Sequence, residues 1–67
     1  MTAISIKDLK EGDYFTLRPI EFPKESQVYV RGHYERSLKK FSVTKFSDTS
    51  SERFLRGNCL VYVGFFF

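Results

Sequence analysis

The fold is decided by the stretch Gln27-Val28-Tyr29-Val30-Arg31-Gly32-His33-Tyr34. Apolar and polar side chains alternate along it, which is the pattern of a β-strand with one buried face. Val28 and Val30 lie on one face of this predicted strand, and Tyr29, Arg31 and His33 lie on the other. We therefore expect the second group to face away from the core.

A glycine interrupts this strand, and another strand follows it. Gly32 stands in the strand interior, where a residue without a side chain indicates a bulge or a sharp bend. After the polar connection 35–39, residues 40–46 alternate again, with Phe41 and Val43 on one side. The two segments together predict an antiparallel hairpin.

Two further strands are predicted on either side of the hairpin. Residues 14–18 alternate apolar with polar side chains, and the loop 19–26 that follows is shaped by two prolines. Ile20 and Phe22 are expected to fix this loop to the core. Residues 59–66 are apolar on both faces, which is typical of a central or covered strand.

Two segments carry the start signals of short helices. Ser5 and Asp8 stand at capping-box spacing, which predicts one or two helical turns over residues 6–11. Thr49 and Glu52 stand at the same spacing and predict a second short turn with an apolar face. Neither segment is long enough to be stable without support from a sheet.

These elements predict one small, mainly β domain over residues 1–67. An SH3-like curled antiparallel barrel or sheet, with one or two short helical turns, fits their order. The lead-in Leu9-Lys10-Glu11-Gly12-Asp13 is similar to that of many such barrels. An antiparallel sheet with one helix across it is the competing architecture. Eight Phe and four Tyr supply the bulk that so short a chain needs to bury a core.

Cysteine usage and hydropathy bear on the setting of the protein. Cys59 is the only cysteine, so no disulfide can form within the chain. The longest apolar segment, residues 59–67, is far shorter than the roughly 20 residues of a membrane-spanning helix. No signal-peptide pattern is present. We therefore expect a cytoplasmic protein with no membrane contact.

The residue types argue against catalysis. His33 is the only histidine and Cys59 the only cysteine, so the usual nucleophile–base pair would need these two residues to meet by chance in the fold. Two such ligands are too few for a zinc site. No glycine-rich phosphate loop occurs. We expect a non-enzymatic binding module without cofactor or metal.

Nucleic acid is the first predicted partner of this module. Residues 31–56 hold seven Lys or Arg against three Asp or Glu, a net charge of +4. Rings that stack on bases, mixed with cations that follow the backbone, are typical of single-strand binders. The predicted contacts are Tyr29, Arg31, His33, Arg36, Lys39, Lys40 and Lys45. The structural alternative is that these cations only block sheet-to-sheet aggregation at an exposed edge.

A protein partner is the alternative prediction. Small barrels often bind through an aromatic groove or an edge strand. The candidate residues are Tyr14, Tyr29, Tyr34, Phe46 and the terminal run Phe65-Phe66-Phe67. If the terminal rings are exposed, they predict a homodimer or a docking surface.

Three segments resemble a family of short uncharacterised proteins from gut bacterial genomes, plasmids and phage-like elements. They are residues 9–17, 28–36 and 61–65. The resemblance implies an origin in a mobile element and no established activity. It therefore identifies no functional residue.

Overall fold

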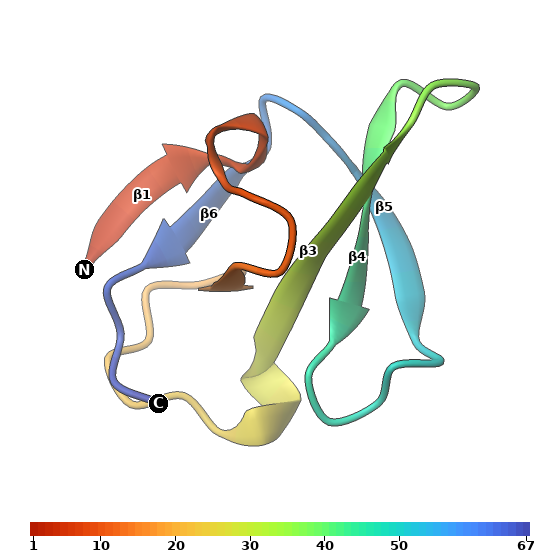
Figure 1. Ribbon diagram of the computed structural model, residues 1–67. Coiled ribbons are helices and arrows are strands. Elements are labelled where there is room, and N and C mark those ends of the chain that lie inside the picture. Colours follow the sequence, from red (N-terminus) through yellow and green to blue (C-terminus); the bar gives the residue numbers. More distant parts are fainter.

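The computed structural model describes all residues, 1–67, as one antiparallel sheet of six strands (Figure 1). The strand order across the sheet is β1-β6-β2-β3-β4-β5. Thus the mainly β fold is confirmed. The strands are β1 (Thr2–Ser5), β2 (Tyr14–Thr16), β3 (Val28–Glu35), β4 (Lys40–Lys45), β5 (Glu52–Arg56) and β6 (Leu60–Val63).

The sheet combines a meander with one long-range insertion. Strands β2 to β5 follow one another in space as they do in sequence, whereas β6 returns to lie between β1 and β2. The last apolar strand was predicted to be central or covered; β6 lies between β1 and β2 rather than at an edge, although Leu60 on it is 60% exposed. Strands β1 and β5 are the two edges and do not pair with each other, so the sheet is not closed.

The only helical elements are two three-residue 3-10 turns, η1 (Ile6–Asp8) and η2 (Glu25–Gln27). No helix has the length and apolar character required to cross a membrane. The predicted turn over 6–11 is shorter than expected, and the Ser5 side chain caps nothing. Instead, the Ile6 N–H donates to the Cys59 carbonyl at 3.0 Å, and the Lys7 N–H to the Gly57 carbonyl at 3.1 Å. The chain after β5 therefore holds this turn in place.

The second predicted helical turn is wrong, because its residues form β5. Leu55 pairs with Phe41 on β4, and Phe54 pairs with Ser42. The Asp48 carboxylate accepts bonds from the Ser50 N–H and hydroxyl, which closes a turn rather than starting a helix. Pairing with a whole neighbouring strand outweighs a local capping signal.

The core lies on the inner, concave face of the curled sheet. Phe15, Ile6 and Val61 are fully buried there. The remaining buried members of the cluster are Leu9, Tyr29, Phe41 and Val43. Side chains of the opposite parity on β2 and β3, Thr16 and Val28, are also fully buried. Both faces of the sheet are therefore covered where β2 meets the start of β3.

The bulge expected at Gly32 is confirmed. Arg31 pairs with Val43 and Tyr34 with Phe41, so two residues of β3 stand opposite one residue of β4. A Cβ at Gly32 would lie 2.9 Å from the backbone oxygen of that residue, Ser42. The bulge needs a glycine because the two backbones approach so closely. It also places Arg31 and Tyr34 on the same face, which strict alternation would forbid.

Candidate binding surfaces

Tyr29, the predicted stacking residue of a nucleic-acid face, belongs to the core. Its side chain is 8% exposed, and its ring stacks on Phe15 with centroids 5.8 Å apart. The two residues stand directly opposite each other in the β2–β3 ladder. The prediction that Tyr29 faces away from the core is wrong. Alternation did separate Tyr29 from Val28, but the sheet is covered on both sides here.

Arg31 also lies on the inner face, as the parity of Tyr29 requires. Its guanidinium carbon stands 4.2 Å from the centroid of the Phe41 ring, at cation–π distance. Its Nε is buried without a hydrogen-bond partner. The side chain is half-buried and held against the core. Arg31 is therefore a packing residue first, and the prediction that it shares an outer face with His33 is wrong.

His33, past the bulge, points to the opposite face from Arg31. Its side chain is 59% exposed, and its Nε2 lies 3.7 Å from Glu35 Oε2. Hydrogen bonds from the Ser37 hydroxyl and then from the Ser37 N–H lower the pKa of Glu35 below its ordinary value of 4.5, and His33 adds a smaller effect. The histidine is thus partnered by the carboxylate next to the turn.

The other predicted cations do not form one group. Arg36 and Lys39 are exposed in the β3–β4 turn, where Lys39 adopts a left-handed φ of 54°. Lys40 is half-buried at the start of β4, directly opposite Arg56 on β5. Lys45 lies at the far end of β4 and is also half-buried. We call Arg36, Lys39, Lys40 and Arg56 the basic end.

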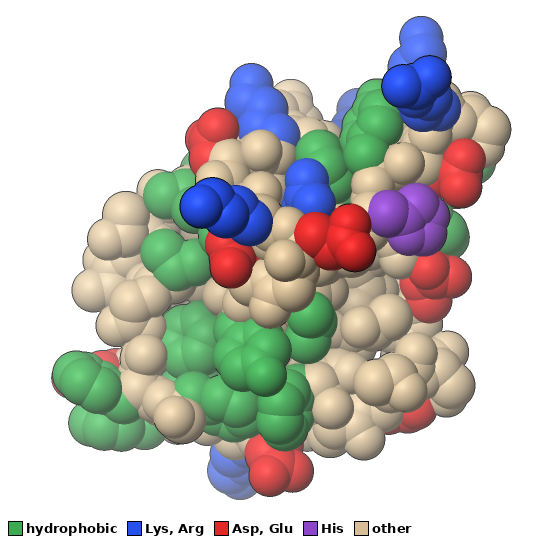
Figure 2. Space-filling view, in the orientation of Figure 1, with side chains coloured by type: hydrophobic (Ala, Val, Ile, Leu, Met, Phe, Trp, Pro, Cys, Tyr) green, Lys and Arg blue, Asp and Glu red, His purple; other side chains and the backbone are tan.

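Three rings on the outer side of the sheet form what we call the aromatic triad: Tyr14, Phe46 and Phe67. The ring centroid of Tyr14 lies 5.4 Å from that of Phe46 and 6.0 Å from that of Phe67. The Phe46 and Phe67 centroids lie 5.0 Å apart, and all three pairs pack edge to face. They remain 45%, 37% and 55% exposed, respectively. Figure 2 shows hydrophobic side chains gathered over the lower half of this view, away from most of the charged groups. Phe67 is therefore exposed, which is the condition under which the terminal rings predict a homodimer or a docking surface.

Backbone hydrogen bonds hold the triad in position. The Phe46 N–H donates to the Val28 carbonyl at 2.9 Å, which continues the β3–β4 pairing by one step. The Phe66 N–H donates to the Glu21 carbonyl at 2.9 Å, which ties the C-terminal segment to the loop after β2. The triad thus joins three parts of the chain that are distant in sequence, and no local pattern announces it.

A second exposed aromatic pair lies beside the triad along the same C-terminal segment. Phe22 and Phe66 stack with centroids 5.5 Å apart and an interplanar angle of 22°. They are 71% and 63% exposed. Phe22 was expected to fix its loop to the core, and this is wrong: it packs on another surface ring instead. Phe65 is half-buried and contacts Phe67 at 6.4 Å.

Comparison of the chain with protein-family models, with curated proteins and with solved structures finds no match in any of the three. The resemblance to short proteins of mobile elements therefore stays a prediction.

Proposed function

We propose that the protein is a non-enzymatic interaction module that docks through the aromatic triad, and that its partner is a second copy of the chain. The observation that carries this proposal is that three rings pack on one another yet stay about half exposed. A chain of 67 residues buries only 11 of them, so burying these rings as well would stabilise a small core. Rings kept outside are available to a partner.

The area of exposed aromatic surface fits a dimer. The triad and the Phe22–Phe66 pair together expose about 540 Å² if a free ring offers about 200 Å². A standard interface buries about 800 Å² on each partner, of which roughly 65% is apolar in its core. An isologous contact of this face with itself would supply that apolar core. Edge-to-face packing fixes the rings beforehand, so little side-chain entropy is lost on docking.

Sedimentation velocity over a range of concentrations tests the proposal. We expect the wild-type chain to shift towards twice its monomer mass as concentration rises, and the double variant Phe46→Ser/Phe67→Ser to remain monomeric. Phe54→Ser is the matched control, because Phe54 is 36% exposed on β5 and makes no triad contact. A wild-type chain that stays monomeric at the highest concentration overturns the homodimer, and so does a double variant that dimerises normally.

Nucleic acid is a second candidate partner, and the basic end favours it. Lys40 and Arg56 stand directly opposite each other on β4 and β5, where like charges are destabilising. No carboxylate lies within ion-pair distance of either cation, since the one contact of that kind in the structure joins His33 and Glu35. A phosphate placed between them would relieve the repulsion. The SH3-like barrel and the cytoplasmic setting also stay predictions.

An oligonucleotide titration at two salt concentrations tests the second candidate. We expect the protein to bind single-stranded DNA at low salt. The affinity should fall as salt rises, because the Lys and Arg side chains displace counterions from the DNA phosphates when they bind. Lys40→Gln with Arg56→Gln should abolish it, while Lys24→Gln with Lys10→Gln, which removes equal charge elsewhere, should leave most of it. Equal loss in both double variants would show only a response to net charge.

A further inference from the structure

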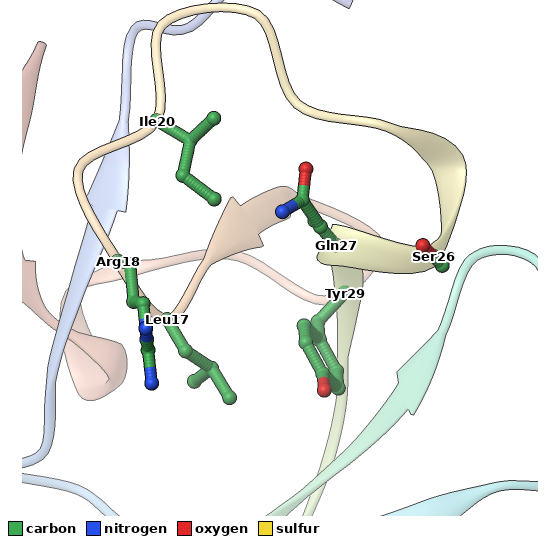
Figure 3. Close-up of a pocket in the computed structure, with 6 residues that line it drawn as sticks. All are labelled: Leu17, Arg18, Ile20, Ser26, Gln27 and Tyr29. Atoms are coloured by element: carbon green, nitrogen blue, oxygen red, sulfur yellow. The ribbon is translucent and has the colours of Figure 1, made fainter.

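A small hollow opens between the loop after β2 and the start of β3 (Figure 3). Its volume is about 210 Å³. The six lining residues are Leu17, Arg18, Ile20, Ser26, Gln27 and Tyr29. None of them belongs to the aromatic triad or to the basic end, so the hollow is separate from both surfaces described above.

The hydroxyl of Tyr29 is a polar group at this hollow that has no hydrogen-bond partner in the chain. The residue is only 8% exposed, and its hydroxyl makes no hydrogen bond within the chain. Arg31 Nε is the one buried side-chain polar atom that lacks a partner, so the Tyr29 hydroxyl is not sealed inside the protein. Tyr29 lines the hollow (Figure 3), so this hydroxyl is a polar group of a lining residue that has no protein partner.

The other polar groups of the hollow are also free to donate. Gln27 Oε1 accepts from the Lys24 N–H at 2.9 Å, which leaves its amide NH₂ as an unused donor. Arg18 makes no ion pair. In Figure 3 the ends of Arg18 and Tyr29 point the same way, with Leu17 between them, and the Gln27 nitrogen is directed towards Ile20.

The turn that presents Arg18 is fixed from behind. The Arg18 carbonyl accepts from the Thr16 hydroxyl at 2.6 Å and from the Ile20 N–H at 2.9 Å. Thr16 is fully buried, so one side of the turn is anchored in the sheet. The guanidinium therefore projects from a constrained backbone rather than from a free loop, which lowers the entropy cost of binding with it.

We infer that this hollow binds a small organic anion: a carboxylate or a phosphate monoester carried on a single ring. The Arg18 guanidinium, a permanent cation, and the Tyr29 hydroxyl point the same way in Figure 3, and together they call for an acceptor with negative charge. Leu17, Ile20 and the Tyr29 ring offer apolar walls for the body of the ligand. The volume is below the roughly 300 Å³ at which sites for drug-sized molecules begin, which limits the ligand to about one ring.

Titrations with benzoate and with phenyl phosphate, followed by amide NMR shifts, test the inference. We expect saturable shifts centred on residues 17–29, and the tighter of the two probes identifies the preferred anion. Benzamide, which has the shape of benzoate without the charge, should bind at least about tenfold more weakly. Failure of both anions to bind, or equal binding of benzamide, overturns the inference.

Variants separate the site from general charge effects. Arg18→Met should weaken the anion about tenfold or more, and Tyr29→Phe should weaken it several-fold while keeping the ring in the core. Lys24→Met is the matched control, because Lys24 is an exposed neighbouring cation that does not line the hollow. An Arg18→Met variant that binds as well as the parent overturns the assignment. These substitutions do not change the aromatic triad, so the binding result holds whether or not the chain forms a dimer.

Discussion

Tyr14 and Phe15 are neighbours on β2, and their rings have opposite fates. Phe15 points inward, is fully buried and stacks on Tyr29. Tyr14 points outward, stays 45% exposed and meets Phe46 and Phe67 edge to face. Both rings have aromatic partners, so aromatic contact does not distinguish them. What differs is whether water is excluded, and this decides which ring holds the fold and which is free to serve a partner.

Removing each of the two rings in turn should have very different effects on stability. Phe15→Ala should cost about 3–5 kcal/mol, because a fully buried ring leaves a cavity, and so small a domain holds little reserve. Tyr14→Ala should cost about 1 kcal/mol or less, because its ring gives up only partial burial. Urea unfolding followed by circular dichroism measures both. Similar losses in the two variants would show that the triad is part of the core.

The bulge in β3 offers a second, smaller test. Gly32→Ala should destabilise by about 1–3 kcal/mol, because its Cβ would lie 2.9 Å from a backbone oxygen and one strand must shift. Gly57→Ala is the control: its Cβ would lie 3.4 Å from the Phe41 ring and 3.5 Å from the Lys7 Cβ, both side-chain contacts. Thermal unfolding of the two variants measures the difference. A Gly32→Ala variant as stable as the parent would contradict the close approach of β3 and β4.

The smallest effect is expected at the exposed turn after β3. Hydrogen bonds from Ser37 hold the pKa of Glu35 below 4.5, so the native state gains from the ionised carboxylate above that value. This gain is lost as pH falls through the lowered pKa. Ser37→Ala should move the pKa of Glu35 back towards 4.5, as seen by NMR titration of its carboxyl carbon. Ser50→Ala, which acts on Asp48 in the same way, should leave Glu35 unchanged.

Local patterns were sufficient for much of the sheet. Alternation located β4 to within one residue of its end and placed Phe41 and Val43 inward, and Gly32 marked the bulge. The apolar run at 59–66 indicated a central or covered strand, although β6 includes only four of its residues, Leu60–Val63. Each of these features depends on side chains within a single strand, which is why the sequence alone contained them.

Features that depend on distant neighbours were missed. Strand β1 has only four residues and is defined by its pairing with β6. The spacing of residues in β5 predicts a helical turn, because the pairing of β5 with β4 does not show in that spacing. Alternation predicts that Tyr29 faces outward, because it separates two faces of a strand without showing that both are covered. The hollow beside Tyr29 likewise depends on how the loop 19–27 folds back over the sheet.

The position of β6 has a consequence for the order of assembly. Strands β2 to β5 can pair one after another during synthesis, because each is adjacent in the sheet to the strand that follows it in sequence. Strand β1 is synthesised before the other five strands but pairs only with β6, because Ile4 is the partner of Val61, far along the chain. Bringing these two strands together closes the longest loop of the sheet and therefore has the largest entropy cost of any strand pairing. Strand β1 therefore has no partner in the sheet until β6 has been made.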